Sequence, residues 1–498
     1  MNINVSSTNA LFSETDRQDI QGFVTSSFGH LPNAAYLFFR FDRGEAARRW
    51  LRELRPEITT ARSWRRRADA PKEAPKKTLN LAFSASGLRG LGLPDNCLES
   101  FPTEFVEGMA APERSCDLGD TEDSAPSGWQ FGNGDRPVDG VALLCADSPE
   151  RLELDRQLFA RQLVETGLGK IVAEECGTRP RDDKEPFGFR DGMAQPSILG
   201  ITKNGVRAGE FILGYENEYG YHPVSPLLRC ALDPAGLLPD SPNPHHRGER
   251  DFGRNGTFLV YRKLEQNVAG FWGFMRDEAK RLHDRMEPGF MIWLAAKMIG
   301  RWPGGAPLTL SPESDDPALS QADNFLYQQL DPNGLRCPFG AHIRRTNPRD
   351  QLRPAGSAES LHMTARHRVL RRGRPYGTPL FDLSVLEHPD SVAARQVLEQ
   401  LTDDGKKRGL HFLCINASIK SQFEFVQQAW MNNARTNGCA DNPDPMASGA
   451  TTGRCGSMLI PQGALDLRTS RLPSFVTVRA GAYLFLPSLS AIRYLSSE

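Results

Sequence analysis

The sequence predicts an α+β fold made of two tandem ferredoxin-like units, each with the element order β-α-β-β-α-β and an antiparallel sheet. Three observations lead to this prediction. Short apolar and aromatic runs alternate with segments whose apolar residues recur at helical spacing. This rhythm occurs once in each half of the chain, with long loop-like stretches between its elements. The 45 Gly and 36 Pro among 498 residues favour a loop-rich protein over a helical bundle.

The N-terminal unit, residues 1–214, carries the first copy of the pattern. Strands are expected over residues 33–41, 78–83, 141–145 and 170–174, and helices over 44–54 and 148–168. The second helix has a well-marked start, because Asp147 and Ser148 can cap it and Pro149 suits its first turn. Gly169 should end it.

The C-terminal unit, residues 256–498, repeats the pattern more loosely. Strands are expected over residues 257–264, 367–371 and 410–415, with a final pair of strands within 475–486, and helices over 266–282 and 419–430. Residues 215–255 are rich in Pro, Gly, His and Arg and are interpreted as a connecting excursion loop. A second insertion covers residues 304–335. Loops of this length in a folded protein are usually functional or disordered.

Charge and composition exclude several classes of function. The 60 Lys and Arg against 61 Asp and Glu give a net charge of −1, which argues against a nucleic-acid partner. The basic run 62–77 is interpreted as a solvated loop. No apolar run approaches the ~18 residues of a membrane span. The first residues show no secretory signal, and nine scattered cysteines without a Cys-x-x-Cys pair indicate free thiols, so a cytoplasmic location is expected.

Two short segments carry the strongest signals for chemistry. In residues 185–196, Gly188 and Gly192 flank Asp191, which places an acid where the backbone turns unusually; an ordinary Asp-Gly turn is the alternative. In residues 337–349, His342 is followed by three arginines, whose guanidinium groups suit a ligand that bears carboxylates. A structural role for His342 is the alternative.

A third segment, residues 369–377 (VLRRGRPYG), reads as a strand that ends in arginines, and such arginines are ordinarily solvated. Neither His-Glu-x-x-His nor Gly-x-Ser-x-Gly occurs, so neither a zinc peptidase nor an α/β-hydrolase is supported.

Taken together, these segments resemble the dye-decolorizing peroxidase family, heme enzymes built from two ferredoxin-like units. The resemblance extends from DIQG at residues 19–22 to QFEFVQQAW at 422–430. The family's Gly-x-x-Asp-Gly stands at residues 188–192. Its proximal histidine segment matches CPFGAHIRRTNPR, and its distal arginine segment matches VLRRGRPYG. Length and insertions are similar to those of the larger bacterial and fungal members.

The resemblance implies a peroxidase with one heme b per chain, held mainly by the C-terminal unit. His342 would be the proximal iron ligand. Asp191 and Arg371 would lie on the distal face, with Arg372 as the competing choice for the arginine. The implied reaction reduces hydrogen peroxide through an oxoferryl intermediate and oxidises dyes, phenolics or other one-electron donors, small or bulky.

Further cofactor contacts are expected at Gly192, Arg344, Leu410, Phe412 and Glu424. Leu410 and Phe412 are two apart on a strand, so they share one face, the apolar distal lining. Arg344 is the candidate for a heme propionate. Glu424 is the candidate for the acid that holds the proximal imidazole, with a surface position on a helix as the alternative.

Bulky reductants cannot enter a small distal pocket, so a surface residue would relay their electrons, with Tyr376 and Trp430 as candidates. Two other functions remain open at the level of sequence. A heme-handling protein of the same fold would need His342 but not Asp191 and Arg371 together. A heme-free tandem α+β binding module would need none of them. The oligomeric state is open, a homo-oligomer included.

Overall fold

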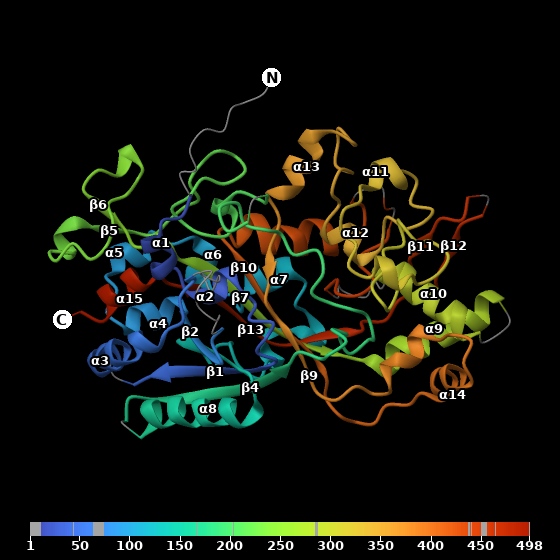
Figure 1. Cartoon of the computed structure of the whole chain (residues 1–498), viewed down its shortest axis with the longest axis horizontal. Coiled ribbons are helices and arrows are strands. Elements are labelled where there is room, and N and C mark those ends of the chain that lie inside the picture. The colour runs from blue at the N-terminus through green and yellow to red at the C-terminus, as the bar shows by residue number, and fades with distance from the viewer. Residues whose placement is uncertain are drawn as a thin grey trace, which may run out of the picture.

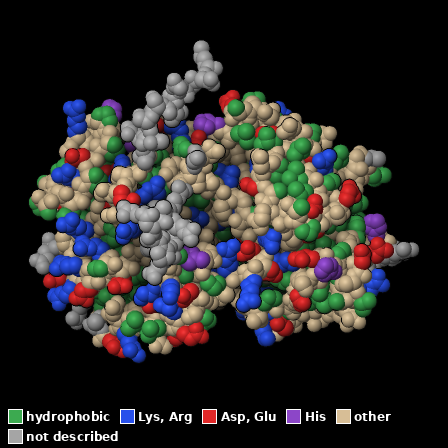
Figure 2. All heavy atoms as spheres, in the orientation of Figure 1, with side chains coloured by type: hydrophobic (Ala, Val, Ile, Leu, Met, Phe, Trp, Pro, Cys, Tyr) green, Lys and Arg blue, Asp and Glu red, His purple; other side chains and the backbone are tan. Residues whose placement is uncertain are grey.

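The computed structural model describes residues 11–42, 44–62, 74–165, 167–202, 204–283, 287–436, 439, 441–449, 456–463 and 465–497. Most of the basic run predicted as a solvated loop, residues 63–73, lies outside them. Within the described part of the chain, no helix is both long and apolar enough to cross a bilayer. Acidic and basic side chains are interspersed over the face seen in Figure 2, in keeping with the near-zero net charge.

The N-terminal half forms a ferredoxin-like unit, as predicted. Its strands are β1 (Asn33–Phe41), β2 (Lys77–Phe83), β3 (Gly140–Ala146) and β4 (Gly169–Thr178). They form an antiparallel sheet in the order β4-β1-β3-β2. Helix α3 (Gly44–Leu54) follows β1, and α8 (Pro149–Val164), capped by the Ser148 side chain, follows β3. Figure 1 shows α8 lying along the outer side of β4.

The C-terminal half repeats this order. Its strands are β7 (Thr257–Gln266), β8 (Leu370–Arg371), β9 (Arg374–Tyr376), β10 (Gly409–Asn416) and β13 (Val476–Leu486). The sheet order is β13-β7-β10-β8, and β9 also pairs with β10. Helix α9 (Val268–His283) follows β7 and packs with α10 (Pro288–Ile299) and α14 (Val392–Gln400), at the right of Figure 1.

The two units share one nine-stranded sheet, because β2 of the first pairs with β13 of the second at Phe83 and Phe485. The buried Gln21 side chain spans this junction, where its Nε2 donates to the carbonyls of Leu81 and Pro487, both at 2.8 Å. At the opposite edges, Gly177 of β4 lies against β9, so the sheet curls back toward itself.

Three large apolar clusters hold these layers together. One lies on the inner face of the curled sheet and joins side chains of both halves, Phe38 and Tyr261 among them. A second lies under α3 and α8 on the outer face. The third packs α9 and α10 around Trp272. The inner cluster links strands far apart in sequence, which ties the folding of each half to the other.

Several predicted elements of the second half differ in the structure. The helix expected over 419–430 forms as two π-helical segments, Lys420–Glu424 and Val426–Asn432. The pair of strands expected within 475–486 is the single strand β13, because a register shift near Ala480 lets one strand follow β7 throughout. The strand expected over 367–371 keeps only two residues, since His367 turns to donate to a carbonyl of the π-helical segment.

Shorter elements complete the fold. The connecting segment 215–255 carries the hairpin β5 (Leu227–Arg229) and β6 (Glu249–Asp251), and the insertion 304–335 carries α11 (Tyr327–Leu330). The remaining elements are α1 (Glu14–Asp19), α2 (Gly22–Thr25), α4 (Ala85–Gly90), α5 (Asp95–Leu98), α6 (Thr103–Glu107), α7 (Pro112–Leu118), α12 (His342–Thr346), α13 (Ala358–Ala365), α15 (Leu489–Leu495), β11 (Leu459–Ile460) and β12 (Leu467–Arg468).

Candidate functional site

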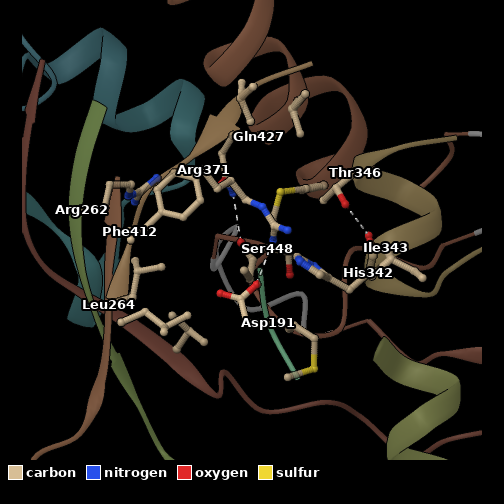
Figure 3. A pocket seen from close by; sticks show the side chains of 18 of the residues that line it. Asp191, Arg262, Leu264, His342, Ile343, Thr346, Arg371, Phe412, Gln427 and Ser448 are labelled. Atoms are coloured by element: carbon tan, nitrogen blue, oxygen red, sulfur yellow. Dashed lines mark hydrogen bonds and ion pairs between the residues drawn. The ribbon is translucent and has the colours of Figure 1, made fainter. Parts of the chain in front are cut away.

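A cavity of about 330 Å³ lies against the C-terminal sheet. Strands β7 and β10 form one wall, and α12 with residues 446–449 forms another. The cavity brings together His342, Asp191 and Arg371, which are far apart in sequence (Figure 3). It is therefore the place where the three sequence segments singled out above can act together.

His342 is the first residue of α12, and its imidazole points into the cavity (Figure 3). Its Nδ1 lies 2.9 Å from Oδ2 of Asp444, which is fully buried. Oδ1 of Asp444 accepts the backbone N–H groups of Met446 and Ala447, each at 2.9 Å, so the carboxylate is fixed in place. An imidazole held through Nδ1 presents Nε2 as its free ligand atom.

The electrostatics of this pair favour charge separation. Burial alone favours the neutral imidazole, but the Asp444 carboxylate outweighs burial and raises the pKa of His342. Burial also opposes the ionisation of Asp444, yet the charge and hydrogen bond of His342 lower the pKa of Asp444. Asp444 is therefore an ionised acceptor that increases the electron-donor strength of the imidazole.

Asp191 stands at the end of a small hairpin, residues 183–191. The backbone N–H of Asp191 donates to the carbonyl of Asp183 at 2.8 Å, and Glu185 N–H donates to Phe189 at 2.9 Å. Gly188 closes the turn with a backbone φ of +102°, a conformation that residues other than glycine rarely adopt. The tight turn of this hairpin thus lies at residues 185–188, before Asp191, whose carboxylate points into the cavity.

Arg371 ends β8 and faces Asp191, with 3.3 Å between Nη1 and Oδ1. Its Nη2 donates to the carbonyl of Met193 at 2.8 Å, which fixes the guanidinium beside the acid. Arg372, the competing choice, points to the other side of the strand. Its Nη2 donates to the carbonyl of Val24 at 3.0 Å, so it caps the end of α2 and does not line the cavity.

Leu410 and Phe412 lie in the cavity wall, as their spacing on one strand face predicts. Leu410 is opposite Leu264 of β7, and Phe412 is opposite Arg262. Gly192 follows Asp191 with φ of +82° and lies beside the cavity without lining it. Its contribution is to turn the backbone after the acid.

The prediction for Arg344 is wrong. This side chain is 1% exposed and does not line the cavity. It donates to Oδ2 of Asp331 at 2.8 Å and stacks between the rings of Tyr327 and Phe339. Two residues along a helix rotate a side chain by roughly half a turn from His342, which directs Arg344 into the protein interior.

Arg349, the last arginine of the same segment, lines the cavity instead. It pairs with Asp323 and stacks on Phe325, while its buried Nε has no partner among the described residues. The buried Oδ1 of Asn347, also in the lining, is likewise unpartnered. A ligand group with a hydrogen-bond acceptor at this end of the cavity would give Nε of Arg349 a partner.

The prediction for Glu424 is also wrong, because Asp444 occupies the place assigned to it. Glu424 faces away from the cavity and accepts hydrogen bonds from Tyr483 at 2.8 Å and Arg114 at 3.1 Å. Burial raises its pKa. The π-helical segment directs Glu424 toward β13. The acid that contacts His342 is instead Asp444, 102 residues further along the chain.

The two relay candidates differ in exposure. Trp430 is only 4% exposed, so it is not a surface residue, although it packs 5.1 Å from His367 of the cavity lining. Tyr376 is partly exposed at the end of β9, with its ring 4.7 Å from that of His411. Tyr376 alone meets the requirement of contact with solvent.

The residues of the cavity fit a heme. Such a ligand needs one axial nitrogen, a largely apolar slot and cationic groups for its carboxylates. Nε2 of His342 supplies the first, side chains such as Leu264, Phe412 and Met446 supply the second, and Arg349 with its unpartnered Nε supplies the third. Among the described residues, no group of three His, Cys, Asp or Glu side chains could hold a bare metal ion.

Comparisons with known proteins point in the same direction. A family model described as the DyP dimeric alpha+beta barrel domain matches residues 19–180. The multifunctional dye peroxidase of an Amycolatopsis species is 31% identical over 480 residues, which cover 92% of this chain and 91% of that protein. A dye-decolorizing peroxidase of Mycetinis scorodonius is 29% identical over 442 residues, 85% of this chain and 77% of the relative.

Solved structures are similar over nearly the whole chain. An ancestral D-type dye decolorizing peroxidase superposes with a TM-score of 0.75 at 29% identity and covers 97% of this chain and 99% of its own. A peroxidase of Auricularia auricula-judae is 29% identical in sequence over 504 residues, 95% of this chain and 86% of that protein. The similarity therefore extends over both ferredoxin-like units.

Proposed function

The chain belongs to the dye-decolorizing peroxidase family, and on this basis we propose that it reduces hydrogen peroxide at a heme in the cavity and oxidises dyes, phenolics or other one-electron donors. The observation that carries the proposal is one cavity that combines a histidine oriented by a carboxylate with a facing Asp–Arg pair. A protein that only handled heme would need the first of these and not the second.

We assign the cavity residues to separate tasks. Bound heme supplies an iron that exchanges electrons with peroxide and then with the reductant. His342 would hold it through Nε2, and Arg349 is our candidate for a heme carboxylate. We further propose heme b, one per chain, because His342 is the cavity histidine whose Nδ1 is held by a carboxylate, and because no cysteine lines the described cavity to attach the macrocycle.

Asp191 and Arg371 would handle the proton and the charge of the reaction. Asp191 accepts the proton of the inner peroxide oxygen and delivers it to the outer oxygen, so that the O–O bond breaks and water leaves. Arg371, 3.3 Å from Asp191, stabilises the negative charge that develops on the departing oxygen. Leu410 and Phe412 exclude bulk water, which strengthens both interactions.

The test is a spectrum followed by an assay. Protein expressed with a heme supply should show a Soret band, and it should oxidise an anthraquinone dye only when peroxide is present, at acidic or neutral pH. No heme uptake would contradict every heme-based function. Heme uptake without peroxide-dependent oxidation would favour heme handling over the proposed peroxidase.

Asp444→Asn should lower peroxide turnover by about 10–100-fold, the usual cost of losing the partner of a ligating histidine. Asparagine can keep the two backbone hydrogen bonds through Oδ1 but presents an N–H group to Nδ1. This favours the imidazole tautomer with its proton on Nε2, the atom needed for the iron. The measurements are turnover with peroxide and the heme reduction potential.

Glu424→Gln is the matched control for Asp444→Asn, since Glu424 is a buried carboxylate that makes no contact with His342. It should leave the reduction potential at the wild-type value. An equal shift in both variants would mean that the potential responds to buried charge in general and not to the His342 hydrogen bond.

We also propose that the protein works in a reducing compartment such as the cytoplasm. The support is that all eight cysteines within the described residues are free. Disulfides are common in proteins of oxidising compartments.

A further inference from the structure

The hairpin that carries Asp191 is held by a buried acid that the proposed reaction does not use. Glu185 is 9% exposed and lies in the cavity lining. Its Oε1 accepts the N–H of Phe189 and its Oε2 the N–H of Phe187, both at 3.0 Å. One carboxylate thus bridges the turn of the hairpin and helps to fix the position of the strand end that carries Asp191.

Gln266, the last residue of β7, is the side-chain partner of this acid. Its Nε2 donates to Oε2 of Glu185 at 2.8 Å. Its own Oε1 is buried and has no hydrogen-bond partner among the described residues. A buried acceptor without a hydrogen-bond partner is unfavourable, so the Gln266 amide has a reason to adopt a second orientation in which Oε1 is paired.

A polar cleft of about 310 Å³ lies on the other side of Gln266. Ser124, Gln266 and Ser474 line both the cleft and the cavity, so they stand between the two spaces. The remaining lining of the cleft is mostly charged, with Glu265, Lys407 and Arg479 at its wall. Gln266 therefore contacts Glu185 on one side and borders this cleft on the other.

Glu185 is poised to change its charge near neutral pH. Burial raises its pKa to about 7, the three hydrogen bonds offset only part of this effect, and the charge of Asp191 adds to it. The other charged groups nearby are engaged elsewhere: Arg371 with Asp191, Arg262 of β7 with Asp120, and Lys184 with Glu387. Helix α9 presents Trp272, which donates to the Phe187 carbonyl, and β13 presents Val476 and Val478.

We propose that Glu185 and Gln266 form a proton-responsive anchor that positions Asp191 for the peroxide reaction. When ionised, Glu185 accepts all three N–H groups and holds the hairpin firmly. When protonated, its O–H needs an acceptor, and half a turn of the Gln266 amide supplies the unpartnered Oε1. The neutral carboxyl holds the backbone N–H groups of Phe187 and Phe189 less strongly, so the hairpin and Asp191 are less well placed.

This proposal rests on the proposed peroxidase function for its kinetic consequence, but not for its effect on folding. In the unfolded chain the carboxyl titrates near 4.5, whereas in the folded protein its pKa is about 7. Between these values the folded protein keeps a proton that the unfolded chain has lost. The contribution of Glu185 to stability therefore falls as pH rises from about 4.5 to 7 and is level above 7, which links one proton of this group to unfolding.

Glu210 offers a matched control. Burial raises its pKa to about 7 as well, and its carboxylate accepts the N–H of Glu218 at 2.9 Å. It does not line the cavity. Glu185→Gln and Glu210→Gln should each remove one linked proton from the pH dependence of unfolding, measured by denaturant titration between pH 4.5 and 8.

Only Glu185→Gln should alter the reaction with peroxide. We expect the stopped-flow rate constant of the wild-type holoenzyme to rise about fivefold through pH 7, the equivalent of one hydrogen bond. Glu185→Gln should show the lower rate at both pH 6 and pH 8, because its amide imitates the protonated acid. Glu210→Gln should keep the rise of the rate constant through pH 7. If the same rise persists in Glu185→Gln, the proposal is overturned.

Gln266→Leu keeps the proposal testable if Glu185→Gln fails to fold. The leucine removes both the donor to the ionised carboxylate and the acceptor for the protonated carboxyl, so the C=O band of protonated Glu185 in infrared pH-difference spectra should shift to higher frequency. An unmoved band overturns the pairing. A holoenzyme that does not react with peroxide at any pH would contradict the peroxidase function. The stability and infrared measurements would still test the Glu185–Gln266 pair in that case.

Discussion

Substitution of His342 by alanine should abolish the normal Soret spectrum and lower peroxide turnover by more than 100-fold. The loss should exceed the 10–100-fold cost of an outer-shell partner, because Nε2 of this residue is the axial atom itself. Added imidazole should restore part of the spectrum if the vacated space accepts a free ligand. The measurements are the absorption spectrum of the purified variant and its steady-state turnover.

His362→Ala is a suitable control for His342→Ala. His362 is an exposed residue of α13 that pairs with Glu218 at 3.1 Å and does not line the cavity. Its removal should leave the spectrum and the turnover unchanged. An unaltered spectrum in His342→Ala would refute the assignment of the axial ligand.

Asp191→Asn and Arg371→Leu should each slow the reaction with peroxide by about 100–1000-fold while heme stays bound. The first variant removes the proton acceptor and the second removes the charge that stabilises the departing oxygen. Because the two side chains contact each other at 3.3 Å, the double variant should lose less than the product of the single losses. Stopped-flow absorbance after peroxide mixing measures all three rate constants.

Heme content, read from the same spectra, separates the chemistry from the binding in these variants. A normal rate of heme oxidation in either single variant would remove that residue from the reaction. Strictly multiplicative losses in the double variant would mean that Asp191 and Arg371 act independently, in spite of their contact.

The local elements of the fold could be predicted because their signals are local. The structure gives β1 the predicted bounds, 33–41, and α3 the predicted bounds, 44–54. Apolar runs bounded by helix formers and turn residues determine such elements without help from distant contacts. The second half was less predictable. Residues 288–299 form the apolar helix α10, which no amphipathic period marks, because Trp272 and its neighbours bury nearly all of its faces.

The residues of the site likewise include some that local sequence signals predict and others that they do not. Asp191, His342 and Arg371 lie in short segments with unusual composition, so they could be proposed from the sequence, and the structure brings them to one cavity. Asp444 could not. Its Asn-Pro-Asp-Pro surroundings indicate a turn, but nothing in them indicates a contact with a histidine 102 residues away. The sequence pointed to Arg344, and the cavity is lined by Arg349 instead, because α12 ends at Thr346 and the chain beyond it turns in a way that no spacing rule predicts.

The position of β13 has a consequence for how the protein is made. It is the last strand of the sheet to be synthesised, yet it lies between β2 and β7 and is the strand that joins the two halves. Val476 and Val478 of β13 also form part of the cavity wall. On the ribosome, the N-terminal unit can form early with an open edge at β2. The cavity stays incomplete until β13 is added, so cofactor loading follows synthesis of this strand.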